Sequence, residues 1–386
     1  MSVGIGRISF YTSNFYLDLK TLAARRDVDP NYFYNDLGQE KMAVCSPDQD
    51  IITLAAAAAK PIIDSVDKNK IRTVIFCTET GIDQSKAAAI YVHKLLGLSN
   101  NCRVIEMKQA CYSASFALSY ASNYVKSHPD EQVLIIAADI AKYGIDTAGE
   151  PTQGAGAVAM LIKADPEIFE YKDQSGFYTE DAMDFWRPNY SETAFVDGKS
   201  SIRLYLKSMI NAWQDLVSRN NVSIDDFDYF CFHLPFTTMS VKALKKLAKV
   251  AEYKDIDFLN SRLLPSLEYN KNTGNCYTGS LYQGLTCLTD NVSNLDNNNI
   301  LCFSYGSGCI AEFFTLKVVK GYREYLFSND HKKLISNRTE LTFEEYQKFY
   351  EFKFVKDGTQ QIIDSFSNNN FKLKEINNHK RIYACE

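Results

Sequence analysis

The chain has 386 residues, of which 46% are hydrophobic and 23% are charged. This length exceeds one minimal domain and suits two halves that share a core, and the composition is typical of a soluble globular protein. The formal net charge is −5, without a block of like charge. That balance argues against nucleic acid as the main partner, but it leaves room for a local basic pocket.

The first residues alternate like a strand through Val3, Ile5, Ile8 and Phe10. No basic stretch followed by an apolar one occurs there, so we expect no signal peptide. The longest apolar run, residues 51–59, is too short to span a bilayer. The ten cysteines form no C-x-x-C pair and no zinc-type spacing, which predicts reduced thiols in the cytoplasm and no metal site.

Continuous apolar runs predict strands covered on both faces, and helical patterns lie between them. The alternation indicates an α/β fold. The predicted strands are 71–79, 131–141, 156–164, 227–235, 298–306 and 310–319, and the predicted helices are 48–65, 83–97, 111–127, 203–219, 239–252 and 278–293. Residues 165–200 interrupt this pattern with an aromatic and acidic stretch, which fits either a packed surface loop or an active-site wall.

The order of strands and helices repeats along the chain. Cys111 lies 28 residues before Asp139, and Asn275 lies 29 residues before Ser304, each pair spanning a helix and a strand. We therefore expect an approximate duplication. The expected parts are a first half (1–165), a connecting and active-site wall segment (166–225), a second half (226–320) and a C-terminal extension packed on the fold (321–386). In the extension, Thr342 begins a capping box, and the last 16 residues fit a strand pair.

Two residues of the first half stand where chemistry is possible. Cys111 precedes an amphipathic helix, where free N–H groups and the helix dipole favour thiolate and can hold an oxyanion. Glu79 closes the buried run "VIFCTE", so burial should raise its pKa toward that of a useful base. Each residue alone also fits a structural role, as packing or as a cap.

The second half offers His233, Asn275 and glycine clusters. His233 ends the apolar run "CFHLP", at the strand end that borders the ligand crevice in open α/β sheets. Asn275 lies in "NTGNCYTGS", a turn into a helix, and is as readily a simple turn residue. The clusters at 152–157 and 304–309 allow close approach to a ligand but lack nucleotide-binding spacing.

Seven motifs in order carry a resemblance: "TETGIDQSKAAA", "QACYSAS", "GEPTQGAGAVAM", "YTEDAMDFWRP", "CFHLPFTTM", "GNCYTGSLY" and "YGSGCIAEFF". Together they resemble the bacterial 3-hydroxy-3-methylglutaryl-CoA synthases of the thiolase superfamily over nearly the whole chain. The resemblance implies the duplicated five-layer αβαβα thiolase-like fold and a homodimer. It also implies condensation of acetyl-CoA with acetoacetyl-CoA and water in the mevalonate pathway, without a cofactor.

The resemblance also implies roles for matching residues. Cys111 carries the acetyl group, Glu79 is the general acid/base, and His233 contacts the second substrate. The implied substrate-binding residues are Asp29, Tyr143, Thr152, Asp184, Ser201, Lys242, Asn275 and Ser307. Thr238 departs from the family, which commonly has lysine there, so phosphate or pantetheine contact rests more on Lys242.

Two related activities remain open from sequence. A ketoacyl synthase III-like enzyme would use Cys111, His233 and Asn275 but has no need of Glu79, because decarboxylation makes its carbanion. A polyketide β-branching synthase would use the same residues on carrier-protein substrates.

Overall fold

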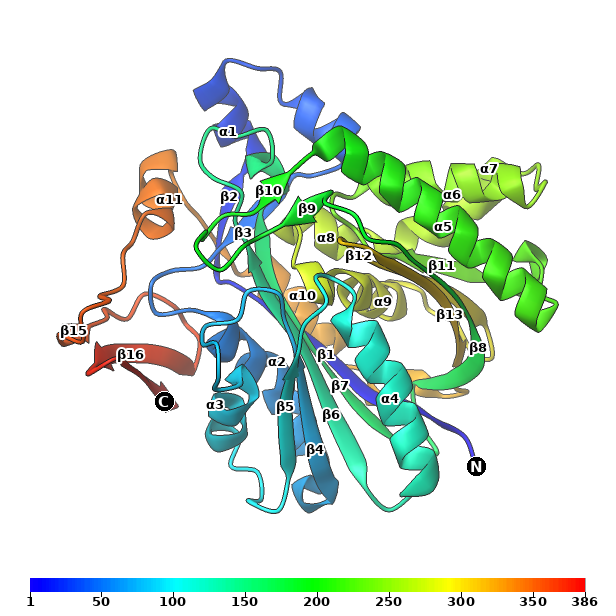
Figure 1. Cartoon of the computed structure of the whole chain (residues 1–386), viewed down its shortest axis with the longest axis horizontal. Helices are drawn as coiled ribbons and strands as arrows, with labels where there is room; N and C mark the ends of the chain where they lie inside the picture. Colours follow the sequence, from blue (N-terminus) through cyan, green and yellow to red (C-terminus); the bar gives the residue numbers. More distant parts are fainter. Residues whose placement is uncertain (386) are drawn as a thin grey trace.

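The computed structural model describes residues 1–385, and its main element is one mixed sheet of nine strands (Figure 1). Its strands are β1 (Val3–Thr12), β4 (Ile71–Cys77), β5 (Arg103–Met107), β6 (Gln132–Ala141), β7 (Gly154–Ala164), β8 (Phe169–Thr179), β11 (Tyr229–Phe232), β12 (Asn299–Gly306) and β13 (Ile310–Val318). Their order across the sheet is β11-β12-β13-β8-β1-β7-β6-β4-β5.

The sheet contains the same pattern twice. On one side, β1 pairs with β7 antiparallel, β7 with β6 antiparallel, and β6 with β4 parallel. On the other side, β8, β13, β12 and β11 pair in the same sequence of directions. The two patterns meet where β1 pairs briefly with β8. The duplication predicted from sequence is confirmed.

Eleven α-helices flank the sheet and the smaller strands. They are α1 (Leu19–Arg26), α2 (Ile51–Ser65), α3 (Ala88–Leu95), α4 (Ser113–Ser127), α5 (Gly198–Asn220), α6 (Thr238–Val250), α7 (Ile256–Leu263), α8 (Glu268–Thr273), α9 (Ser280–Asn291), α10 (Ser328–Ser336) and α11 (Phe343–Tyr350). Short helical turns are η1 (Tyr32–Leu37), η2 (Lys68–Lys70), η3 (Glu150–Thr152), η4 (Ile224–Asp226), η5 (Leu264–Ser266), η6 (Tyr277–Gly279) and η7 (Tyr322–Tyr325).

Alternate residues of each strand enter different cores, which creates five layers. In β4, Ile75 and Cys77 pack in a central core with α4 and α9, while Val74 and Phe76 pack outward on α2 and α3. In the second repeat, one face of β11, β12 and β13 packs in the central core. Helices α5, α6 and α7 cover the other face of these strands. The layers are therefore α2/α3, first repeat, α4/α9, second repeat and α5/α6/α7, as expected for the thiolase-like fold.

Two strands of the sheet were not predicted. β8 lies in residues 166–225, which we expected to be a connecting wall, because its sequence "FEYKDQSGFYT" has no apolar run. By strand order it is the second repeat's counterpart of β1. β5 was missed because it is a short edge strand with exposed positions. α5 begins at Gly198, earlier than predicted, because the Asp197 side chain caps it.

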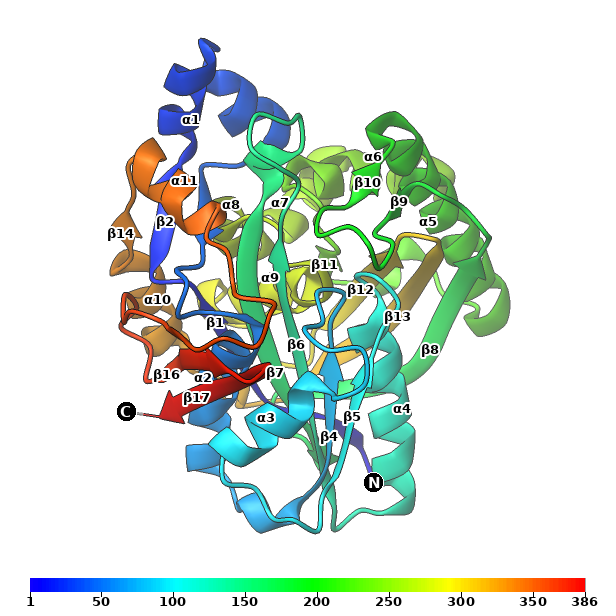
Figure 2. The same cartoon turned by 60° about the vertical axis from the view of Figure 1, so that its left-hand side comes forward.

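The C-terminal extension lies along the first repeat (Figure 2). Its strand β14 (Thr339–Glu340) joins β2 (Phe15–Asp18) and β3 (Lys41–Val44) in a small sheet, and β15 (Gln361–Ile362), β16 (Phe371–Asn377) and β17 (Lys380–Cys385) form another. The predicted final strand pair is confirmed, as is the capping box of Thr342 and Glu345.

A two-stranded ribbon, β9 (Phe185–Trp186) with β10 (Phe195–Val196), precedes α5. Among residues 1–385, no helix is long and apolar enough to span a membrane.

Candidate active site

Cys111 and Glu79 lie in hydrogen-bonding contact. The Cys111 thiol donates to Glu79 Oε1 over 3.0 Å. Cys111 follows β5 just before α4, and Glu79 follows β4, so two parallel neighbouring strands bring them together. This contact joins a nucleophile to a carboxylate that can accept its proton.

The electrostatics of this pair differ from the thiolate expected at a helix start. Burial and the neighbouring Glu79 carboxylate raise the pKa of Cys111 well above its usual range. Burial and the charge of Asp139 raise the pKa of Glu79 to about 8. The prediction of a raised Glu79 pKa is confirmed. The prediction of a stabilised thiolate is wrong, because desolvation and an adjacent carboxylate outweigh the helix start.

Asp139 holds the backbone of Glu79 in place. This fully buried carboxylate, at the end of β6, accepts hydrogen bonds from the backbone N–H groups of Glu79 and Thr80 at 2.9 and 3.0 Å. It also accepts from the Thr78, Thr80 and Thr278 hydroxyls and from the Thr278 N–H. Thr278 belongs to η6, which comes from the second repeat. The Asp139 carboxylate therefore connects both repeats to the backbone of Glu79.

Arg187 is a second neighbour of Glu79. Its guanidinium lies 3.6 Å from Glu79 Oε2 and donates to the Glu79 backbone carbonyl. Both side chains are largely buried. The arginine charge lowers the pKa of Glu79, against the larger effect of burial. Arg187 therefore favours the ionised form of the carboxylate.

Asn275, Tyr143 and Thr152 form one wall beside this pair. Asn275 Nδ2 donates to the Tyr143 hydroxyl over 3.2 Å, and its backbone N–H donates to the Thr152 carbonyl over 3.2 Å. Asn275 Oδ1 accepts from Tyr277 N and from the Ser280 hydroxyl at the start of α9. The structure thus brings these three sequence-predicted residues together, and it fixes the amide orientation of Asn275.

Ser307 lies in the turn between β12 and β13, which packs on the segment before α4. The Ser307 carbonyl accepts from Gln109 Nε2 over 3.2 Å. A Cβ on Gly306 would lie 2.7 Å from the Gln109 carbonyl and 2.7 Å from Tyr112 Cβ. Glycine is therefore required for the turn to approach the nucleophile this closely.

A buried tyrosine–carboxylate pair lies behind Cys111. The Tyr112 hydroxyl donates to Glu312 Oε2 over 2.5 Å, and Glu312 is 5% exposed. Burial raises the pKa of Glu312 to about 7. The pair ties the residue after the nucleophile to β13 of the other repeat.

Asp184 and Ser201 contact each other directly. The buried Asp184 carboxylate accepts from the Ser201 hydroxyl over 3.1 Å, from the Tyr305 hydroxyl over 2.8 Å and from Gly308 N over 3.0 Å. These bonds anchor the segment before α5 to the β12–β13 turn. In this structure Asp184 positions the wall around Ser307.

His233 leaves the sheet at the end of β11 and is 2% exposed. Its backbone N–H donates to the Phe303 carbonyl over 2.7 Å, and its carbonyl accepts from the Tyr205 hydroxyl over 2.8 Å. Nδ1 is buried without a partner, and burial lowers the pKa of the ring to about 3. The ring is therefore neutral at physiological pH and free to donate one hydrogen bond. It makes no hydrogen bond to Cys111 or Glu79.

Asp29 and Lys242 lie outside this cluster. Both are exposed, and neither bonds to the residues around Cys111 among those described. The ammonium of Lys242, which lies on α6, is 5.2 Å from the Phe236 ring centre. Thr238, at the family's lysine position, donates its hydroxyl to the Asp36 carbonyl of η1 over 2.6 Å. Thr238 thus has a structural bond instead of a charge.

Sequence reasoning missed Asp139 and Arg187 as site residues. Asp139 carried a usable signal, because it is a carboxylate inside the apolar run 131–141. Arg187 carried none beyond its place in a Trp-Arg-Pro break, since its contact spans 108 residues.

Comparison with known families agrees with this geometry. Residues 1–167 match the family model for the N-terminal part of hydroxymethylglutaryl-coenzyme A synthase, and residues 168–257 and 245–386 match that for its C-terminal part. The chain belongs to the hydroxymethylglutaryl-CoA synthase family. The hydroxymethylglutaryl-CoA synthase of Enterococcus faecalis is 42% identical over 99% of this chain and 100% of its own length.

Two further family members bear on substrate choice. A crystal structure of a hydroxymethylglutaryl-CoA synthase complexed with CoA superposes with a TM-score of 0.94, at 43% identity and over 100% of both chains. The polyketide biosynthesis 3-hydroxy-3-methylglutaryl-ACP synthase PksG of Bacillus subtilis is 34% identical over 94% of this chain and 91% of its own. The E. faecalis enzyme and the synthase complexed with CoA are thus more similar in sequence to this chain than PksG is.

Proposed function

We propose that the chain condenses acetyl-CoA with acetoacetyl-CoA and water to give 3-hydroxy-3-methylglutaryl-CoA and CoA, as a step of the mevalonate pathway. The observation that carries this proposal is the contact of the Cys111 thiol with the Glu79 carboxyl, whose pKa is about 8. A decarboxylating ketoacyl synthase has no need of such a base. Family membership and the E. faecalis relative support the same substrates.

The first half-reaction is acetyl transfer. Glu79 accepts the Cys111 proton as sulfur attacks the acetyl-CoA carbonyl, and the carbon–sulfur bond to CoA breaks. The leaving CoA sulfur takes that proton, and Glu79 returns to its ionised form. Asp139 and Arg187 hold the Glu79 backbone through both transfers.

The second half-reaction forms the carbon–carbon bond. Ionised Glu79 removes a methyl proton from acetyl-Cys111, and the enolate attacks C3 of acetoacetyl-CoA. Neutral His233 donates a hydrogen bond to the C3 oxygen as it gains charge. Protonated Glu79 then gives the methyl proton to that oxygen, which completes the hydroxyl group and returns Glu79 to its ionised form. Water then cleaves the thioester to Cys111 and releases the product. Every step uses the chain's own residues and two thioesters, so the proposal includes no resident metal or cofactor.

The remaining residues are proposed to bind the substrates. Asn275, Tyr143, Thr152 and Ser307 line the thioester, and the wall held by Asp184 and Ser201 encloses it. Lys242 and Asp29 belong to the outer, CoA-facing part. The Lys242 ammonium is unpaired with any described carboxylate, which supports a contact with a phosphate group.

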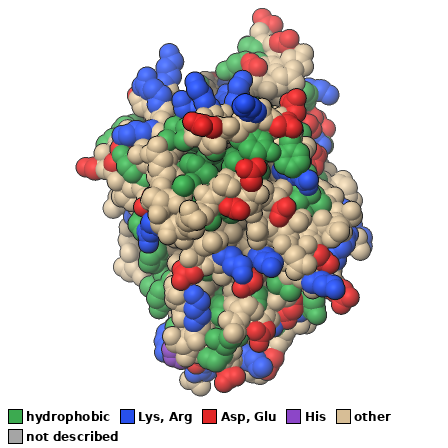
Figure 3. Space-filling model, turned by 90° about the vertical axis from the view of Figure 1, so that its right-hand side faces the viewer, with side chains coloured by type: hydrophobic (Ala, Val, Ile, Leu, Met, Phe, Trp, Pro, Cys, Tyr) green, Lys and Arg blue, Asp and Glu red, His purple; other side chains and the backbone are tan. Residues whose placement is uncertain are grey.

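We also propose a homodimer in the cytoplasm. The edge strand β5 and the adjacent α4 expose Ile105, Phe116 and Tyr120, and such an edge favours pairing with a second copy. On the face shown in Figure 3, basic and acidic side chains are intermixed, which supports small-molecule and protein partners over nucleic acid. All ten cysteines are free thiols, as suits a reducing compartment.

The test combines substrate choice with intact-protein mass. Acetyl-CoA should add one acetyl group to the wild-type chain and to Cys77→Ala, but none to Cys111→Ala. Acetoacetyl-CoA should then release the hydroxymethylglutaryl product without a carrier protein. Activity only with malonyl or carrier-bound substrates would contradict the proposal and favour one of its rivals.

A further inference from the structure

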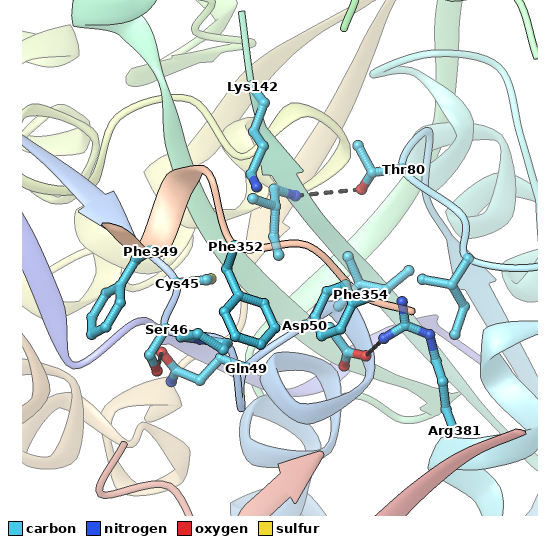
Figure 4. Close-up of a pocket in the computed structure, with 14 residues that line it drawn as sticks. Cys45, Ser46, Gln49, Asp50, Thr80, Lys142, Phe349, Phe352, Phe354 and Arg381 are labelled. Carbon is cyan, nitrogen blue, oxygen red and sulfur yellow. Dashed lines mark hydrogen bonds and ion pairs between the residues drawn. The ribbon is translucent and has the colours of Figure 1, made fainter. Parts of the chain in front are cut away.

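A cavity of about 170 Å³ lies between the first repeat and the C-terminal extension (Figure 4). The rings of Phe349, Phe352 and Phe354 form an apolar wall on the side of the extension. Polar groups of the first repeat, among them Lys142 and Gln49, face it from the other side. The residues of the proposed reaction do not line this cavity.

Lys142 supplies a cation without a counter-ion. It follows β6, and its ammonium points toward Cys45 and Phe352 in Figure 4. Its contact on the protein is the Tyr350 ring, 4.9 Å from the ammonium to the ring centre, and no described carboxylate pairs with it. Burial lowers the pKa of Lys142. A half-buried ammonium that lacks an anion is costly, so an anionic guest would stabilise it.

Gln49 is a second polar side chain that lines the cavity. It is 3% exposed, and its Oε1 accepts from the Ser13 and Ser46 hydroxyls at 2.7 and 3.3 Å. Its Nε2 is buried without a hydrogen-bond partner. Buried amide N–H groups are rarely left unpaired. This Nε2 atom has almost no accessible surface, so the free polar group that the cavity wall offers to a guest is the Lys142 ammonium.

The other charges around the cavity limit the charge of a guest. Arg381 already pairs with Asp50 at 3.1 Å, and Asp50 also accepts from the Tyr383 hydroxyl at 2.6 Å. Nearby, Glu192 pairs with Lys356 at 2.5 Å. Lys142 therefore remains as the unpaired charge inside the lining, since neighbouring Lys353 is not part of it. The cavity offers one free cation, and its arginine guanidinium is already paired, so it lacks the bidentate donor that often binds phosphate. A guest with a single negative charge therefore fits better than a phosphate dianion.

We propose that this cavity binds a small organic monoanion, a carboxylate with an apolar body of about six carbon atoms. A cavity of about 150 Å³ holds a molecule of benzene size, which sets the size of that body. The carboxylate contacts Lys142 Nζ, and the body packs on the three phenylalanine rings. The guest also borders Thr80, directly after Glu79, while Lys142 directly precedes Tyr143.

Calorimetric titration of hexanoate into the full chain, saturated with CoA to occupy the reaction site, tests the proposal. Wild type should bind one hexanoate, and Lys142→Met should bind it about tenfold more weakly or worse, because a charged hydrogen bond is lost. Lys142→Arg keeps the charge and should keep binding. Lys249→Met, the matched loss of an exposed lysine on α6 that has no role in the proposed reaction, should bind hexanoate as wild type does.

Three outcomes would overturn the proposal. They are equal binding of 1-hexanol, displacement of hexanoate by inorganic phosphate, and loss of binding in Lys249→Met. If Lys142→Met melts much lower than wild type, crystals of wild type soaked in 6-bromohexanoate decide instead. An anomalous bromine peak beside Phe352 supports the site, and a peak only near Cys111 excludes it.

Discussion

The hydrogen bond between Cys111 and Glu79 makes two side chains compete for one proton. Glu79→Gln removes the negative charge that holds the Cys111 pKa high, but it also removes the base. Because the thiol ionises more readily without the Glu79 charge, we expect the variant still to form acetyl-enzyme, more slowly than wild type, and to lose condensation by roughly 10²–10⁴-fold. Intact mass after acetyl-CoA, and product formation with acetoacetyl-CoA, measure the two steps on one protein. Near-normal condensation would show that Glu79 is structural.

The raised pKa of Glu79 predicts opposite effects of pH on rate and stability. The condensation rate should rise as pH passes through about 8, because only ionised Glu79 accepts the methyl proton. The folded chain retains this proton between the ordinary carboxyl range and pH 8, whereas the unfolded chain releases it, so this group's stabilisation falls as pH rises there. Glu79→Gln should therefore gain melting temperature relative to wild type at pH 8 but not at pH 4. Equal gains at both pH values would contradict the shift.

Arg187 is predicted to act through Glu79. Arg187→Met removes a charge that lowers the Glu79 pKa, so the pH profile of condensation should move to higher pH. Arg187→Lys should move it less. Arg219→Met, at the far end of α5, is the matched control and should leave the profile in place. A lower rate with an unshifted profile would mean that Arg187 only supports the fold.

Single residues were predictable where they end apolar strands. Glu79 and His233 follow β4 and β11, topological counterparts in the two repeats, and both stand out in the sequence as polar residues closing buried runs. The state of Cys111 was not predictable from its helix, because its pKa depends on a carboxylate 32 residues away. Arg187 reaches the site only through the tertiary fold.

Among the elements, α10 is fastened by a buried hydrogen bond from a histidine to a carboxylate. His331 Nδ1 lies 2.8 Å from Asp290 on α9, its Nε2 accepts from Phe10 N on β1, and Asp290 also accepts from the Tyr269 and Ser328 hydroxyls. Asp290→Ala should lower the free energy of unfolding by about 3 kcal/mol, because it leaves buried donors unpaired. Asp64→Ala, which breaks an exposed pair with Lys60, should cost less than about 1 kcal/mol. Chemical denaturation measures both, and similar small losses would contradict the prediction.

At this scale, apolar runs predicted the strands that are covered on both faces. β8 was not predicted, because polar residues alternate along it. Its place in the sheet also depends on pairing with β13, which lies more than 130 positions later in the chain. The limits of α5 and α3 differed from prediction by several residues, because caps such as Asp197 decide where a helix begins.

For the whole molecule, the exposed edge at β5 predicts a dimer. Phe116→Glu, at a side chain 52% exposed in the single chain, should halve the mass found by sedimentation, because it would bury a charge at the interface. Phe258→Glu, on exposed α7, should leave the mass unchanged. A wild-type chain that sediments as a monomer would refute the interface.

The bond between Tyr112 and Glu312 joins residues 200 positions apart, and the bonds of Asp139 to Thr278 join residues 139 apart. During synthesis the nucleophile therefore cannot be held in its final place until β13 has left the ribosome. Topologies rich in such distant contacts fold slowly. In a refolding experiment, helical signal should return first and acetylation of Cys111 last, so catalytic competence marks the completion of folding in this chain.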